Sequence, residues 1–152
     1  MKHTLFSISL LIAFGAGAQS SIEAVGKASK IIDEVRAVHA PDKRQVVFDI
    51  KAYNDPDGGM IVGGKTSEAS ARDALVAQLN ASGADYSDRI AVLPDTLWAQ
   101  PRISVACLRT RPGHASEMAS QAIMGMPLRV LEKEGDWYRV QTPDGYIAWV
   151  TG

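Results

Sequence analysis

Residues 103–150 read ISVACLRTRPGHASEMASQAIMGMPLRVLEKEGDWYRVQTPDGYIAWV, and this stretch decides the fold class. Short apolar runs alternate with turn signals at the spacing of about 8–12 residues that is typical of small all-β domains. Thr-Pro-Asp-Gly at 142–145 predicts a hairpin turn, because proline presets an early turn position and glycine accepts positive φ. The aromatic and β-branched residues at 137–141 favour a strand before that turn, and 146–150 is the predicted returning strand. The pattern therefore predicts a small β-barrel or sandwich.

Several motifs in this stretch resemble those of a known family. They are Leu108-Arg109 with Pro112, Ser116-Glu117, Gly125, Gly135-Asp136-Trp137-Tyr138 and Gly145-Tyr146-Ile147-Ala148-Trp149-Val150. Their spacing is similar to that of bacterial SH3-like domains of cell-wall proteins. It is most similar to the domain that precedes the catalytic domain in NlpC-type cysteine peptidases of the dipeptidyl-peptidase VI kind. Those enzymes are γ-D-glutamyl-L-diamino acid endopeptidases that trim peptidoglycan stem peptides.

The resemblance covers residues 95–151 and implies an SH3-like β-barrel over 102–152. In related domains a further turn and a short closing strand follow the element that ends at Val150, and the catalytic domain comes next. The sequence stops at Gly152. We therefore expect the barrel to lack its last strand, and the chain to be either a natural truncation or a fragment. A barrel without that strand has an unpaired edge.

The region between residues 19 and 94 predicts a separate small domain. Apolar residues recur every three to four positions in two segments, which indicates helices, and alternate in others, which indicates strands. The expected elements are a helix at 21–39, strands at 44–53 and 60–65, a helix at 67–82 and a strand at 86–93. Such an αββαβ unit packs its helices on one face of a three-stranded sheet. It loosely resembles small domains of exported proteins that bind envelope components.

The fold prediction is therefore an α+β chain with an αββαβ domain at 19–94, a linker at 95–101 and an SH3-like domain at 102–152. Ser67 is the expected N-cap of the second helix, and Glu68 is the expected first-turn acid, where the helix dipole favours negative charge. The loop at 54–59 contains acids and an asparagine, but it is too short for a calcium loop and is interpreted as a hairpin turn.

Residues 1–18 predict a signal peptide. The apolar run at 5–14 is shorter than the roughly 20 residues that a bilayer span needs, and the small residues at 16–18 fit a cleavage site before Gln19. The alternative is a buried N-terminal helix. A periplasmic or secreted location is expected, with no stable membrane span once the segment is removed.

The composition argues against several classes of partner and site. There are 16 basic and 17 acidic residues and no basic stripe, so a nucleic-acid partner is not expected. One cysteine and three dispersed histidines argue against an internal disulfide, a metal site and a metal cofactor. Glu132, Glu134 and Asp136 are interpreted as solvated acids around a hairpin turn.

The resemblance raises the question of catalysis, because NlpC-like peptidases need a cysteine thiolate, a histidine base and a third polar group. The single cysteine, Cys107, lies in the middle of a predicted strand, and His114 is seven residues further on. A Cys107–His114 pair is the least favoured reading, and an inert strand cysteine is the favoured one. We therefore predict no catalytic residue, and the question of enzymatic activity stays open.

Binding residues follow only from the resemblance. In the family, the SH3-like domain helps to form the pocket for the free amino end of the stem peptide, which implies a carboxylate beside an aromatic wall. The matching positions are Glu117 and Tyr146, and Arg109 is a candidate partner for a peptide carboxylate. Without the resemblance, Glu117 is interpreted as an exposed loop acid, Tyr146 as a cross-strand packing residue and Arg109 as a solvated charge at a strand end. Trp137 and Trp149 are expected in the core.

Two functions are carried forward. The first is an exported module that recognises peptidoglycan stem peptides, as the targeting and substrate-shaping front part of a cell-wall endopeptidase whose catalytic NlpC-like domain lies elsewhere. The alternative is a free-standing envelope binding protein that recognises wall peptides or a protein partner. The muropeptide, the oligomeric state and the role of the αββαβ domain are left open by the sequence.

Overall fold

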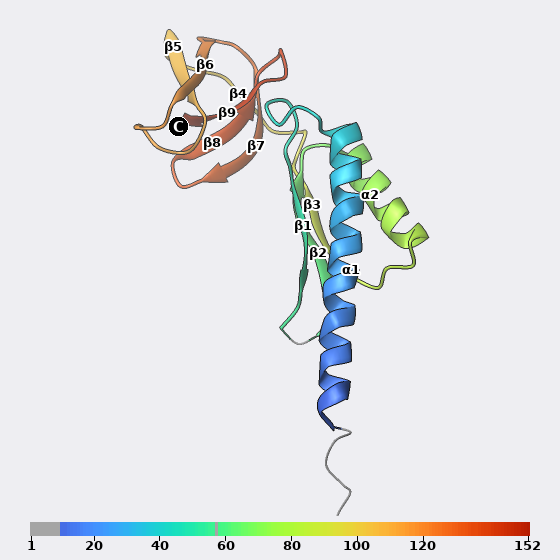
Figure 1. Cartoon of the computed structure of the whole chain (residues 1–152). Helices are drawn as coiled ribbons and strands as arrows, with labels where there is room; N and C mark the ends of the chain where they lie inside the picture. The colour runs from blue at the N-terminus through green and yellow to red at the C-terminus, as the bar shows by residue number, and fades with distance from the viewer. Residues whose placement is uncertain (1–9, 57) are drawn as a thin grey trace, which may run out of the picture.

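The computed structural model describes residues 10–56 and 58–152, which form two units connected by a short segment (Figure 1). The first unit contains α1 (Leu10–His39), β1 (Phe48–Asn54), β2 (Met60–Thr66), α2 (Ala69–Ala81) and β3 (Ser87–Val92). Its sheet has the order β1-β2-β3, in which β2 pairs antiparallel with β1 and parallel with β3. Both helices cover the same face of this sheet (Figure 1). The predicted αββαβ order is confirmed.

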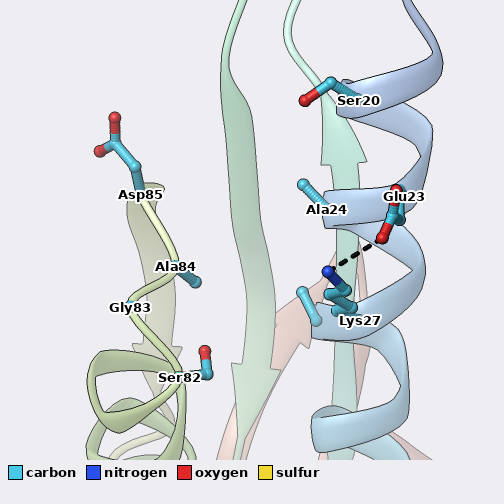
Figure 2. A pocket seen from close by; sticks show the side chains of 9 residues that line it. Ser20, Glu23, Ala24, Lys27, Ser82, Gly83, Ala84 and Asp85 are labelled. Carbon is cyan, nitrogen blue, oxygen red and sulfur yellow. Dashed lines mark ion pairs between the residues drawn. The ribbon is translucent and has the colours of Figure 1, made fainter.

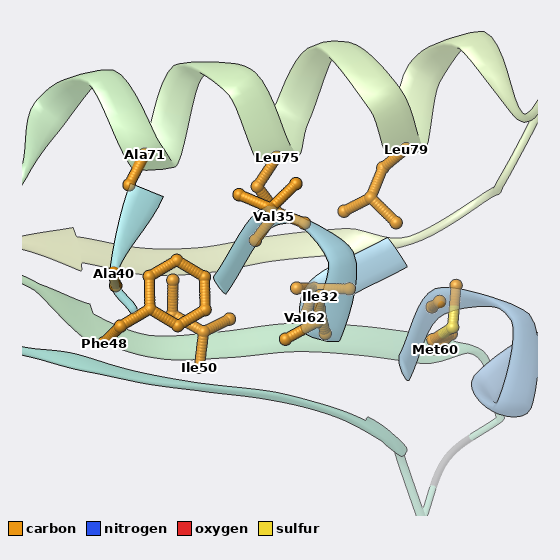
Figure 3. Packing of buried hydrophobic residues seen from close by; sticks show 11 residues of the cluster. Ile32, Val35, Ala40, Phe48, Ile50, Met60, Val62, Ala71, Leu75 and Leu79 are labelled. Atoms are coloured by element: carbon orange, nitrogen blue, oxygen red, sulfur yellow. The ribbon is translucent and has the colours of Figure 1, made fainter. Parts of the chain in front are cut away.

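The core of the first unit lies between the two helices and the sheet (Figure 3). Ala71, Leu75 and Leu79 recur at helical spacing on α2 and are fully buried. They face a second layer of buried side chains from α1, β1 and β2, namely Ile32, Val35, Phe48, Ile50 and Val62. Burial of this apolar stripe, more than intrinsic helix propensity, holds α2 in place.

α1 extends further toward the N-terminus than the predicted helix does. The expected helix starts at residue 21, whereas α1 begins at Leu10 and continues without a break through Ala18 and Gln19, between which cleavage is predicted. The start of the predicted signal peptide, residues 1–9, lies outside the described residues. Cleavage therefore stays a prediction. Over residues 10–56 and 58–152, no helix combines the length and the apolar character that crossing a membrane requires.

Two local predictions in the first unit need correction. β1 begins at Phe48 and not at residue 44, because the backbone N–H groups of Gln45 and Val46 donate to the carbonyl of Asp42 in a turn. Ser67 is not the cap of α2. Its hydroxyl instead accepts a hydrogen bond from the Val47 N–H at 3.1 Å, and Glu68, which forms no side-chain cap, occupies the N-cap position.

The second unit is a curved sheet of six strands. They are β4 (Trp98–Ala99), β5 (Val105–Arg109), β6 (Met118–Ile123), β7 (Leu128–Glu134), β8 (Trp137–Gln141) and β9 (Ile147–Thr151). Their order is β4-β7-β8-β9-β5-β6. Within the described residues no ladder joins β4 to β6, so this sheet is open. The sequence predicted an SH3-like barrel that lacks its last strand and has an unpaired edge, and the structure shows an open sheet with two edge strands, β4 and β6.

The segment expected to be a linker, residues 95–101, contributes a strand of its own. β4 lies inside it and pairs antiparallel with β7, so that Trp98 stands opposite Arg129. The Val130 N–H also donates to the carbonyl of Leu97 at 2.7 Å. The connecting segment is thus part of the second sheet, and it fixes where the chain enters that sheet.

Apolar contacts join the two units. Val47 of the first unit packs with Leu131 and Ile147 of the second, and all three are buried. Backbone bonding reinforces this contact, because the Ile147 N–H donates to the carbonyl of Arg44 at 2.6 Å. The Gln141 side chain likewise donates to the carbonyl of Gln45 at 2.9 Å.

Candidate functional site

The predicted site residue Arg109 is anchored at the end of β5. Its guanidinium donates to the carbonyl of Ser116 at 2.6 Å, across the loop that connects β5 to β6. Its backbone stands opposite Trp149 of β9 on one side and Met118 of β6 on the other. Arg109 therefore shapes this loop, and its half-buried guanidinium keeps donors that Ser116 does not use.

Glu117 lies in the same loop, one residue before β6, and is exposed. Its carbonyl accepts a hydrogen bond from the Thr110 N–H at 3.0 Å, which closes the loop. No ion pair or side-chain hydrogen bond to its carboxylate occurs within the described part of the chain. The backbone of Glu117 is therefore fixed, while its charge faces solvent.

Tyr146 directly precedes β9 and is half-buried against the core of the second unit. Its carbonyl and N–H both hydrogen-bond the hydroxyl of Thr142, which fixes the turn between β8 and β9.

The fold places Arg109 and Glu117 together, on one β-hairpin. Tyr146 approaches from β9, and the strand order β9-β5-β6 puts it two strands away from Glu117. Among residues 10–56 and 58–152, no hydrogen bond, ion pair or ring contact joins Tyr146 to either other residue. The role of these three residues in binding therefore stays a prediction.

A charged cluster between the two units escaped the sequence reading. Asp49 and Lys65 are cross-strand neighbours on β1 and β2, and each pairs with a side chain of the second unit. The Lys65 ammonium donates to the Glu132 carboxylate, and Arg139 lies 2.9 Å from Glu132 and 3.5 Å from Asp49. Glu132 is consequently not the solvated turn acid of the prediction.

The ionisation of Glu132 reflects these partners. Burial raises the pKa of its carboxyl, but hydrogen bonds from Lys65 and Arg139, together with their positive charge, outweigh burial and lower that pKa. Arg139 also lies over the Trp149 ring, with 5.8 Å from guanidinium carbon to ring centroid. Trp149 is buried, as predicted, and Trp137 is half-buried.

The reading of Cys107 and His114 as a reactive pair finds no support in the geometry. Cys107 is an exposed residue in the middle of β5, opposite Gln121 of β6. The His114 ring packs edge-on against Trp137, with the ring centroids 5.1 Å apart. No hydrogen bond links the thiol to the imidazole in the described ranges. Those ranges also contain no group of three or more His, Cys, Asp or Glu side chains that could hold a metal ion.

The first unit has a shallow hollow of its own, between α1 and the loop that follows α2 (Figure 2). Glu23 and Lys27 line it and form an ion pair of 2.9 Å one helical turn apart. Asp85 lies on the opposite wall. Because Glu23 and Lys27 neutralise each other, the net charge of the lining comes from Asp85.

A comparison with known families matches part of this chain. Residues 108–152 match the model of the bacterial dipeptidyl-peptidase SH3 domain, which takes in the last two residues of β5 and all of β6 to β9. The match leaves the αββαβ unit and β4 outside. No curated protein matches the chain. Residues 108–152 thus form an SH3-like domain similar to that of bacterial dipeptidyl-peptidases.

Proposed function

We propose that this chain is a peptidase-associated recognition module that binds peptidoglycan stem peptides outside the cytoplasm. The observation that carries the proposal is the match of residues 108–152 to the SH3 domain of bacterial dipeptidyl-peptidases. In such a module the β5–β6 loop meets the ligand, and the chemistry takes place in a catalytic domain. The signal-like segment at 1–18 supports export.

The β5–β6 loop suits a peptide with a free amino terminus. The exposed carboxylate of Glu117 is an acceptor for an ammonium group, and a charge-assisted hydrogen bond is stronger than a neutral one. Arg109 has free donors beside it for a carboxylate of the same peptide. Tyr146 supplies an aromatic ring at the neighbouring strand end. Ammonium, carboxylate and aliphatic groups all occur in a stem peptide.

The firm junction between the two units favours the targeting role. A module that shapes a substrate site must keep a constant orientation, and the Glu132 cluster with the Val47–Leu131 contact provides one. The second candidate is a free-standing envelope protein that binds wall peptides or a protein partner. It requires the same loop but no catalytic domain. Reading the gene downstream of the Gly152 codon separates the two, because the first requires a continuation that encodes a cysteine and two histidines.

The binding test is a calorimetric titration of the purified chain with L-Ala-γ-D-Glu-diamino acid. We expect Glu117→Gln to weaken binding by about tenfold or more, because it removes the charge that faces the ammonium group. N-acetylation of the peptide should cause a similar loss in the wild type and little further loss in Glu117→Gln.

Glu134→Gln is the matched control, because Glu134 is an exposed acid at the end of β7 and no hydrogen bond or ion pair joins it to the β5–β6 loop within the described residues, although His114 of that loop packs on the neighbouring Trp137. It should bind like the wild type. If the wild-type protein binds the acetylated and free peptides equally, the proposed recognition of the ammonium group is wrong.

A further inference from the structure

A second hollow, away from the β5–β6 loop, has unpaired charges of opposite sign. It measures about 420 Å³ and lies where the connecting segment meets the turn between β8 and β9. Its polar and aromatic lining comes from Asp95, Trp98, Arg129, Gln141 and Thr142. None of Glu117, Arg109 and Tyr146 lines it, although Tyr146 directly follows Gly145, which does.

Arg129 provides the positive charge. Its guanidinium donates to the Gln141 side chain at 3.2 Å and to the Ser67 carbonyl at 3.4 Å. Its Nε is buried and has no acceptor within the described residues. No carboxylate pairs with Arg129 in the same part of the chain. A half-buried guanidinium whose contacts are all neutral keeps its affinity for a carboxylate, because neutral acceptors do not compensate its charge.

Asp95 and Trp98 complete the lining. Trp98 stands directly opposite Arg129 in the β4–β7 ladder, so both side chains project from the same face of the sheet. Trp98 is 63% exposed, which is unusual for a residue with so large an apolar side chain. Asp95 borders the same hollow and is exposed, and no ion pair joins it to Arg129 in the described ranges.

We infer that this hollow binds a small zwitterion, an amino acid or a dipeptide. The ligand carboxylate pairs with Arg129, its ammonium group with Asp95, and its aliphatic part rests on the indole of Trp98. Binding at both ends explains why the two charges border one hollow without pairing with each other. The volume lies at the lower end of the range for small-molecule sites, which suits a ligand of this size.

The test uses the full chain labelled with ¹⁵N and three probes: the dipeptide Ala-Ala, its N-acetyl form and its C-terminal amide. The Trp98 indole N–H and the Gly145 amide, which borders the hollow, report binding. We expect both signals to move with Ala-Ala at concentrations up to about 10 mM, and each blocked form to bind at least about tenfold more weakly.

Variants at exposed positions carry the test, because Arg129 also has structural hydrogen bonds. Asp95→Asn should make the free and the N-acetyl dipeptide bind equally, and Trp98→Ala should weaken all three probes. Glu117→Gln and Glu134→Gln should bind like the wild type, so the outcome is independent of the stem-peptide proposal. Failure of either signal to move with Ala-Ala, equal affinity for free and blocked forms, or unchanged selectivity in Asp95→Asn would overturn the inference.

Discussion

Leu131→Ala tests whether the two units behave as one body. Leu131 is 1% exposed and packs against Val47 of the first unit and Ile147 of the second. Truncation of a buried leucine destabilises a protein by about 2–5 kcal/mol, and the loss is larger where the cavity cannot collapse. The cluster is small and lies at a junction, where neighbours can move inward. We therefore expect a loss near the lower limit, about 2–3 kcal/mol.

Leu128→Ala is the matched control. Leu128 is 2% exposed, lies three residues earlier on β7, and belongs only to the core of the second unit. Urea unfolding followed by circular dichroism gives the free energy for each variant. Hydrogen exchange of the Val47 amide, which bonds the Ser67 hydroxyl inside the first unit, reports on the junction.

Both variants should lose stability, but only Leu131→Ala should speed exchange at Val47 beyond its change in global stability. The reasoning fails if Leu131→Ala loses less than about 1 kcal/mol, since a buried leucine at a real junction cannot be that dispensable. It also fails if the two variants change Val47 exchange equally, because the units would then not communicate through this contact.

Three further predictions concern single positions. Gly64→Ala should destabilise by at least about 3 kcal/mol in urea unfolding, because an added Cβ would lie 1.9 Å from the Asp49 carbonyl oxygen at a φ of +134°. Gly59→Ala, at a φ of +111° but with open space, should lose only about 1 kcal/mol. Glu132→Gln should be less stable than the wild type at neutral pH. The pKa of Glu132 is lower in the folded state than in the unfolded state. The ionised carboxylate therefore contributes fully to the free energy of unfolding above the unfolded-state pKa of about 4.3. The difference in thermal midpoint between the wild type and Glu132→Gln should therefore narrow as the pH falls below about 4.3 and through the folded-state pKa. A difference that stays constant with pH would contradict the stabilising role of the Glu132 carboxylate. Cys107→Ser should leave stem-peptide binding unchanged in the same calorimetric titration, because the thiol is exposed and lacks a base.

The order of elements in the first unit was predictable because its signals are local. The stripe of α2 and the alternation in β1 each depend on residues only a few positions apart. The start of β1 was harder to predict, because the turn at Asp42 that precedes it is stabilised by Arg44, which lowers the pKa of the Asp42 carboxyl to about 2. The role of Ser67 was not predictable, since its partner is the distant Val47.

In the second unit and the candidate site, too, local features were predictable from the sequence and long-range contacts were not. The turns flanking β8 were visible in the sequence, whereas β4 is only two residues long and has no pattern of its own. Lys65, one of the two partners of Glu132, comes from the other unit, so composition around the β7–β8 turn favoured a solvated acid. Glu117 was identified through resemblance alone, its carboxylate is exposed, and its role in binding stays a prediction.

The bonds between the units do not run through the segment that connects them in sequence. The Ile147–Arg44 backbone bond, the Gln141–Gln45 bond and the Glu132–Lys65 pair all bypass residues 95–97, which are exposed. A protease that cleaves the chain there would break the covalent connection and leave these bonds between the units intact. The two pieces should therefore stay associated, and the protein is a natural starting point for a split pair of fragments that reassemble without a linker.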